Sequence, residues 1–340
     1  MSATQTLAPQ TPVKADGKPK KKKHAMGLRE KHDALTGWAF MAPFAILYIL
    51  VFLIPILVAL WTSLFIEKVP EGGGPLAQKE VVFSGLENYY NVIFESNFWH
   101  GILRVLAYTV LQVPVMIIAA LALALVLDSY LVRRPTVFRI GYFLPFAIPG
   151  LVGAIVWNYM YSLGFSPLVK GLEALGLDMT SGRYPFLSVF QDPHFIIGSM
   201  ANMTTWTFTG YNMLIFLAAL QAIPTDLYEA ARLDGATGFQ IVTKIKIPMV
   251  RAAALLAVLL SIVGTIQIFN EPQVMRTSAT WMSNDYTPMM MALSTMRENV
   301  TGMDVGNGPA GAVSVMMALV AGVLALVYFM VDRKIGGGND

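Results

Sequence analysis

Six stretches of this chain contain no Asp, Glu, Lys or Arg, although charged residues make up 13% of the whole sequence. They cover residues 34–66, 105–127, 140–169, 195–225, 252–270 and 305–331. Each stretch is long enough for a helix to cross about 30 Å of hydrocarbon. Transmembrane β-strands are only about 10 residues long and alternate in polarity, which these stretches do not. The pattern predicts an all-α integral membrane protein with six transmembrane helices.

The basic residues predict the domain organisation and the orientation. If the N-terminus is cytoplasmic, 17 of the 24 Lys and Arg residues lie on the cytoplasmic side, as the positive-inside rule requires. We therefore expect residues 1–33 to form a disordered basic tail and residues 34–331 to form the membrane domain. Residues 332–340 are expected to form a second cytoplasmic tail. The lysine run at 20–23 could also bind anionic lipid.

The residues that are missing exclude several kinds of chemistry. The chain has no cysteine, so it has no disulfide and no Cys-ligated metal or cluster. The charge-free stretches hold no buried acid or base, with Asp128 and Glu271 only at helix ends. Since ion-driven carriers normally need such a group, ion coupling is disfavoured. We expect no catalytic residue and no metal site in this chain.

Neutral polar and aromatic residues are concentrated in two of the predicted helices. Such side chains suit a neutral polar solute such as a sugar, although the same residue types also join helices by hydrogen bonds. The candidate substrate path consists of Asn202, Thr205, Trp206, Tyr211 and Asn212, together with Gln267 and Asn270.

Two further segments are expected to depart from straight spanning helices. Pro145 and Pro149, with Gly150 and Gly153, predict a break in the third helix, which either lines a substrate path or is a packing kink. The apolar stretch 286–296 is too short to span a membrane. It is more simply an external helix lying on the bundle than a re-entrant loop.

The loop between the fourth and fifth helices, residues 222–250, is the most structured polar segment. Thr225 or Asp226 is placed to cap a first short helix, and the turn at Asp234-Gly235 is placed to end it. Thr237 can cap a second helix, along which Phe239, Val242 and Ile245 would form an apolar stripe that Pro248 ends. These signals predict a compact helix–turn–helix projecting into the cytoplasm, able either to dock a partner or to pack on itself.

The spacing within this loop resembles the EAA loop of the membrane permeases of binding-protein-dependent ABC importers. The match consists of Glu229-Ala230-Ala231, Gly235 after three residues, Ile245, and Ile247-Pro248, where the family usually has Leu before the Pro. The stretch Gly85-Leu86-Glu87-Asn88-Tyr89 and the approach 217–224 resemble the carbohydrate group. Overall the chain is similar to the maltose-type permeases, nearer the larger of their two permease subunits. Residues 275–279 depart from the Thr-Gly-Gly-Pro-like stretch of the family.

The resemblance implies a fold, a function and a set of partners. The fold is that of a type I ABC importer permease in a bacterial or archaeal inner membrane. The partners are a second homologous permease, a pair of ATPase subunits that bind ATP and Mg²⁺, and an extracytoplasmic solute-binding protein, with lipid around them and no nucleic acid. The solute implied is a di- or oligosaccharide. The residues implied to couple to the ATPase are Glu229, Ala230, Ala231, Arg232, Asp234, Gly235, Ile245 and Pro248.

The ATPase itself is expected in another chain, because this sequence has no Gly-x-x-x-x-Gly-Lys-Ser/Thr phosphate loop. We therefore expect no enzymatic activity and no cofactor here. Two alternatives remain: an ABC permease for a solute other than sugar, and, less favoured, an ion-coupled secondary carrier.

Overall fold

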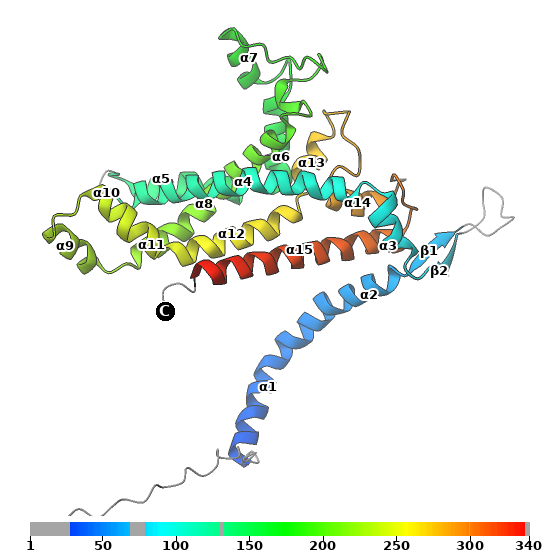
Figure 1. Ribbon diagram of the computed structural model, residues 1–340, viewed down its shortest axis with the longest axis horizontal. Helices are drawn as coiled ribbons and strands as arrows, with labels where there is room; N and C mark the ends of the chain where they lie inside the picture. The colour runs from blue at the N-terminus through cyan, green and yellow to red at the C-terminus, as the bar shows by residue number, and fades with distance from the viewer. Residues whose placement is uncertain (1–27, 69–78, 130–131, 299, 337–340) are drawn as a thin grey trace, which may run out of the picture. The chain divides into compact units, whose positions relative to one another are not determined.

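A computed structural model of the protein describes residues 28–68, 79–129, 132–298 and 300–336. The chain divides into two units, Met1–Pro55 and Ile56–Asp340. The first unit contains α1 (Leu28–Tyr48) and the π-helical turn η1 (Ile49–Leu53), and the boundary between the units falls within the next helix, α2 (Ile54–Thr62) (Figure 1). The predicted tail therefore falls largely outside the described residues, and its last part, residues 28–33, belongs to α1.

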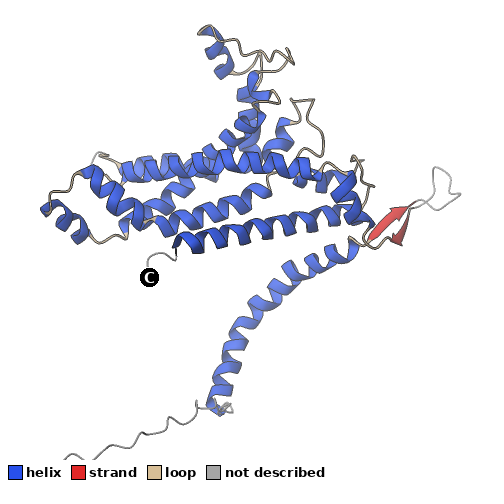
Figure 2. Cartoon of the chain, viewed as in Figure 1, coloured by secondary structure: helices blue, strands red, loops and turns tan. Residues whose placement is uncertain are grey.

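The chain is mostly helical, as the charge-free stretches predict (Figure 2). Four helical runs are long and apolar enough to cross a membrane: Thr36–Thr62, Phe98–Leu127, Arg251–Met275 and Asn307–Met330. Two further candidates are bent pairs, and counting each pair as one span gives six. One pair, Pro135–Ala147 with Gly150–Tyr161, turns by 95°, and the other, Ile196–Gln221 with Thr225–Leu233, by 67°.

The second unit is built around long helices that run side by side (Figure 1). They are α4 (Phe98–Leu127), α8 (Ile196–Gln221), α12 (Arg251–Ile266) and α15 (Asn307–Gly336). One core cluster joins Ala120 and Ala124 of α4 to Phe216 and Leu220 of α8 and Ala257 of α12. Small residues at these crossings let the helix backbones approach closely, which is how helices associate in lipid.

The predicted break in the third span lies between α5 (Pro135–Ala147) and α6 (Gly150–Tyr161). Ile148 is extended, with ψ of 131°, because the residue before a proline avoids the helical region. Pro149 follows with ψ of 131°, and the chain then enters α6 in a new direction. This part of the sequence prediction is confirmed.

A short hairpin adds the β-structure that an all-α prediction does not contain. Strands β1 (Phe65–Lys68) and β2 (Glu80–Phe83) pair antiparallel, followed by α3 (Glu87–Tyr90) and the turn η2 (Asn91–Glu95). The buried Asn88 side chain donates to the carbonyls of Ser63 (2.7 Å) and Phe65 (2.8 Å), which fixes the hairpin to the end of α2.

The segment from 286 to 296 forms a helix, as predicted, over α14 (Pro288–Thr295). The Thr287 side chain caps it, and Met290 and Met291 are fully buried. It packs against α4 and α15 and follows the short helix α13 (Asn270–Met275).

The chain between α6 and α8 is held by one carboxylate. This segment contains α7 (Pro167–Ala174) and the 3₁₀ turn η3 (Val189–Gln191). Asp192 accepts hydrogen bonds from the Ser181 hydroxyl, from the His194 backbone N–H (2.9 Å) and from the His194 ring (2.7 Å). The Ser181 and His194 donors hold the pKa of Asp192 at about 2, below its ordinary value of 3.8.

We predict that Gly210→Ala disrupts the packing of α5 on α8. A Cβ at Gly210 would lie 1.8 Å from the Tyr142 carbonyl oxygen, so the two backbones must separate. The purified variant should unfold at a temperature at least about 5 °C lower, which corresponds to a few kcal/mol. Gly198→Ala on the same helix is the control, since nothing lies within 4 Å of its Cβ position. Equal unfolding temperatures for the two variants would contradict the close contact.

We predict that Asp192→Asn loosens this segment at neutral pH but not in strong acid. A lowered pKa means that the Asp192 carboxylate stabilises the fold above pH 3.8, and that this contribution is lost as the pH falls toward 2. At pH 7 the variant should lose about 2 kcal/mol of local stability. Trp281, whose ring N–H donates to the Gln191 carbonyl at 3.0 Å, is a fluorescent reporter of this loss. A difference from the parent that persists unchanged at pH 2 would contradict the assignment.

Candidate functional site

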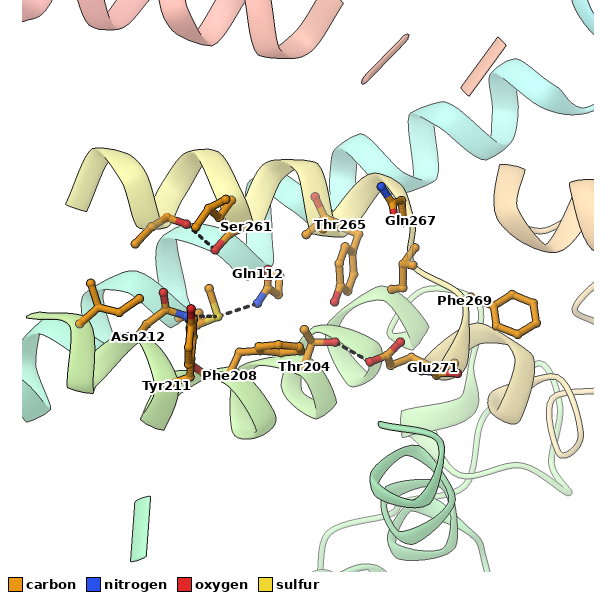
Figure 3. Close-up of a pocket in the computed structure, with 18 residues that line it drawn as sticks. Gln112, Thr204, Phe208, Tyr211, Asn212, Ser261, Thr265, Gln267, Phe269 and Glu271 are labelled. Atoms are coloured by element: carbon orange, nitrogen blue, oxygen red, sulfur yellow. Dashed lines mark hydrogen bonds between the residues drawn. The ribbon is translucent and has the colours of Figure 1, made fainter. Parts of the chain in front are cut away.

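A cavity of about 320 Å³ opens between α4, α8, α12 and the start of α13 (Figure 3). Its walls are apolar with a set of neutral polar groups, the composition expected of a small-molecule site. The lining residues are Tyr108, Gln112, Met116, Thr204, Phe208, Tyr211, Asn212, Ile215, Ala257, Leu260, Ser261, Gly264, Thr265, Gln267, Ile268, Phe269, Asn270 and Glu271.

Four of the seven residues predicted for a substrate path line this cavity: Tyr211, Asn212, Gln267 and Asn270. The other three, Asn202, Thr205 and Trp206, are not among its lining residues. Asn202 donates to the Tyr161 hydroxyl at 2.8 Å, and the Trp206 ring packs edge-on against that of Trp157, with centroids 5.9 Å apart. The carbonyl of Thr205 accepts a hydrogen bond from Thr209. Asn202 and Trp206 therefore join α8 to α6, whereas the contact of Thr205 lies within α8.

The sequence prediction missed several polar lining groups, namely Tyr108, Gln112, Thr204, Ser261 and Thr265. Helical spacing could have found some of them. Thr204, Phe208, Tyr211 and Ile215 follow one another at intervals of three or four residues, and so share one face of α8. Asn202 and Trp206 lie on the other side of that helix, whereas Thr205 comes seven residues before the lining residue Asn212 and so lies near the same face without lining the cavity. The sequence prediction treated α8 as one polar set rather than face by face.

Glu271 lies at a helix end, as the sequence predicts, in the first turn of α13. It lines the cavity, and the apolar run Arg251–Met275 includes it. The Thr204 hydroxyl of α8 donates to its carboxylate at 2.9 Å (Figure 3). The sequence alone does not show that this acid faces a cavity.

The polar groups in the cavity wall also join the helices around it. The Thr109 hydroxyl of α4 donates to Thr265 of α12 at 2.8 Å, and the Asn212 amide of α8 donates to the sulfur of Met116 of α4 at 3.6 Å. Within the described part of the chain no group of three His, Cys, Asp or Glu side chains could hold a metal ion.

The second candidate region is the loop 222–250, which forms the predicted helix–turn–helix. It contains α9 (Thr225–Leu233), α10 (Gly238–Ile241), the π-helical turn η4 (Val242–Lys246) and α11 (Ile247–Met249). Thr237 and Gln240 form a reciprocal capping box at α10, as predicted for Thr237. The predicted cap on α9 is wrong, because Pro224 occupies the N-cap position and no side chain caps it.

Gly235 ends α9 as predicted. Its φ of +78° is in the left-handed region, which glycine adopts without a steric penalty. The Gly235 N–H donates to the Arg232 carbonyl (3.0 Å), and the Ala236 N–H to that of Ala231 (2.9 Å). This pair of bonds is a Schellman motif, which satisfies carbonyls at the helix end.

The surface of the helix–turn–helix is open. Glu229, Ala230, Arg232, Asp234, Gly235 and Pro248 are exposed, while Ala231 and Ile245 are half-buried. Leu233 is 89% exposed and Phe239 is 78% exposed. Of the predicted apolar stripe, Phe239 is thus exposed and Val242 and Ile245 are half-buried, while Ile241 is the buried residue of α10.

One ion pair attaches this loop to the end of α4. The Lys246 ammonium lies 2.6 Å from the carboxylate of Asp128, the residue after α4, and the two side chains are only 14% and 15% exposed. The same ammonium lies 5.3 Å from the centre of the Tyr228 ring of α9. Asp128 and Lys246 are 118 residues apart, so the contact joins distant parts of the chain.

Comparison with known proteins identifies relatives along nearly the whole chain. Residues 82–337 match the family described as binding-protein-dependent transport system inner membrane component. The lactose transport system permease protein LacF of Rhizobium radiobacter is 30% identical over 308 residues, covering 90% of this chain and 97% of that protein. The trehalose/maltose transport system permease protein MalF of Thermococcus litoralis is 27% identical over 240 residues, covering 70% of this chain and 76% of that protein.

Solved structures share the fold. A chain of a bacterial ABC transporter that imports the acidic polysaccharide alginate superposes with a TM-score of 0.64 at 18% sequence identity. The match covers 90% of this chain and 97% of that chain. A second structure of a bacterial alginate ABC transporter, in complex with a periplasmic protein bound to an alginate pentasaccharide, gives the same TM-score at 20% identity.

We predict that Lys246→Met loosens the helix–turn–helix, because the change leaves the Asp128 carboxylate without its partner in a largely buried position. The expected loss is roughly 3 kcal/mol, seen as faster amide hydrogen exchange across residues 225–250. Lys244→Met is the matched control, since Lys244 is exposed. The double variant Asp128→Lys with Lys246→Asp should recover part of the protection. Equal exchange in the two single variants would show that the pair does not anchor the loop.

Proposed function

Since the chain belongs to the family of binding-protein-dependent transport system inner membrane components, we propose that it is the permease subunit of an ATP-driven sugar importer. It is a multi-pass membrane protein, and its task is to carry a di- or oligosaccharide through the membrane. The sugar is delivered by an extracytoplasmic binding protein, and ATP is hydrolysed by separate subunits.

The lining of the cavity is the single observation that carries the solute class. Hydroxyl groups of a sugar need donors and acceptors, which Asn212, Gln267 and Asn270 supply. The apolar face of a sugar ring needs a flat apolar surface, which Phe208 and Tyr211 supply. Relatives whose names include lactose, trehalose and maltose support the same class of solute.

The exposed helix–turn–helix is the proposed contact with the ATPase. Leu233 and Phe239 offer apolar area, and Ala230 and Ala231 permit close approach of a partner groove. Glu229, Arg232 and Asp234 add charges at the rim. With both termini in the cytoplasm, this loop lies on the cytoplasmic side, where ATP is available.

The proposed mechanism is alternating access. ATP binding draws the ATPase subunits together and moves the docked α9. The Lys246–Asp128 ion pair passes that movement to the end of α4. Further along α4, Tyr108 and Gln112 line the cavity, so displacement of this helix changes the cavity walls. A second, homologous permease would complete the path for the solute.

The proposal is tested by purifying this chain from its own host in mild detergent and identifying the proteins that accompany it. A second permease, two phosphate-loop ATPase subunits per complex and sugar-stimulated ATP hydrolysis are expected. Purification of the chain alone, even after crosslinking, would contradict the ABC importer and favour the ion-coupled carrier. An intact complex that amino acids or peptides stimulate, and sugars do not, would contradict the solute class only.

We predict that Gly235→Pro abolishes ATP-coupled uptake while leaving membrane insertion intact. Proline fixes φ near −65°, whereas position 235 requires +78°, so the end of α9 cannot form as it stands. Uptake of radiolabelled sugar by proteoliposomes should fall at least about 100-fold when docking is lost.

Gly238→Ala is the control for this variant, because residue 238 has no contact within 4 Å of its Cβ position. It should transport at the parental rate. Parental uptake by Gly235→Pro would overturn the assignment of the coupling loop.

A further inference from the structure

The cavity contains one carboxyl group and no basic side chain. Of its lining residues in the described chain, Glu271 alone carries a carboxyl group, and none is Lys, Arg or His. None of the ion pairs found among the described residues includes Glu271, and the neutral hydroxyl of Thr204 donates to it. An acid in an apolar run without a cation is costly and is normally found facing a cavity where it has a function.

An acceptor without a hydrogen-bond partner lies in the same wall. Gln112 is 1% exposed, and its side-chain oxygen has no hydrogen-bond partner in the described structure. Its amide nitrogen is directed at the sulfur of Met116, 3.2 Å away (Figure 3). Buried polar atoms are normally paired, so an orphan acceptor at a cavity indicates a ligand that donates.

We propose that Glu271 selects the charge of the solute. The carboxylate and the Gln112 oxygen make this a site for groups that donate hydrogen bonds, namely the hydroxyls of a neutral saccharide or the ammonium of an amino sugar. Uronates are disfavoured, because a uronate carboxylate cannot donate a hydrogen bond and is repelled by the Glu271 carboxylate. This inference rests on the proposed sugar transport and narrows its substrate class.

The expected selectivity follows from Coulomb's law. At a separation of roughly 6 Å and an effective dielectric constant of about 20, two carboxylates repel strongly enough to lower occupancy on the order of 100-fold. The same field attracts an ammonium group. Glu271→Gln keeps the shape and an acceptor oxygen, and removes only the charge.

The chain has no native cysteine, so a single introduced thiol can report the charge in the cavity through its reaction rates with cationic and anionic reagents. Phe208→Cys places a single thiol on the cavity wall, on α8 one turn beyond Thr204. The purified importer is treated with 2-(trimethylammonium)ethyl or 2-sulfonatoethyl methanethiosulfonate. In each reaction the thiolate attacks the thiosulfonate sulfur, forms a disulfide and releases methanesulfinate. Modification of this chain is followed by mass spectrometry.

With Glu271 present, the cationic reagent should react faster than the anionic one by about 10-fold or more, after correction for the rates with a free thiol. Glu271→Gln should reduce that preference to near unity, and Glu271→Asp should retain it. The control is Glu173→Gln, which removes an exposed charge on α7 away from the cavity. If Glu271→Gln kept the full preference for the cationic reagent, this proposal would be overturned, while the proposed sugar import would be unaffected.

The consequence for transport is tested in proteoliposomes with neutral disaccharides and their uronate-bearing counterparts. Only pairs that the isolated binding protein binds equally are used, and the binding protein itself is present in the assay. The parental importer should favour the neutral member, and Glu271→Gln should lose most of that preference. A preference that survives the change overturns the role of Glu271. Uptake of no saccharide at all by the parental importer overturns the proposed function and this inference with it.

Discussion

Hydrocarbon offers no hydrogen-bond partner, and this constraint determines where every polar group of the molecule lies. Backbone groups are satisfied within helices, so the apolar stretches fold as helices and little else. Polar side chains can find hydrogen-bond partners in two ways. They pair across a helix contact, as Thr109 does with Thr265, or they face a cavity that a solute can enter, as Gln112 and Glu271 do. The candidate site is therefore the place where internal pairing is incomplete.

One helix connects the two candidate regions. Asp128 at the end of α4 holds Lys246 of the loop, and residues 108, 112 and 116 of the same helix line the cavity. α4 contains Pro114 between Asp128 and Gln112, a position at which a helix can kink. In the proposed mechanism, movement of the loop reaches the cavity through this helix and the ion pair at its end.

Much of this could be predicted from sequence, because the signals are local. The charge-free stretches predicted the spanning helices, and Pro149 predicted the break between α5 and α6. In the loop, Asp234-Gly235 predicted the turn that ends α9, and Thr237 predicted the cap of α10. Contacts between distant residues could not be predicted in this way. Nothing near Lys246 in the sequence points to Asp128, and the direction in which Asn202 or Trp206 faces depends on how α8 is rotated in the bundle. Glu271 could be placed at a helix end from sequence, but not in the wall of the cavity, because that depends on how α13 packs against α8.

The helix–turn–helix has a rigid backbone and exposes large apolar side chains on its surface. The Schellman motif at Gly235, the capping box at Thr237 and the Lys246 ion pair fix its backbone from both ends. Leu233 and Phe239 stay exposed because a helix pair this short has no interior in which to bury them. A flexible loop with the same apolar residues would rearrange to bury them. It would also bend when a partner moved, and so would not pass that movement on. In the proposed mechanism, the rigid loop keeps Leu233 and Phe239 available to the ATPase and passes the movement of the ATPase on to α4.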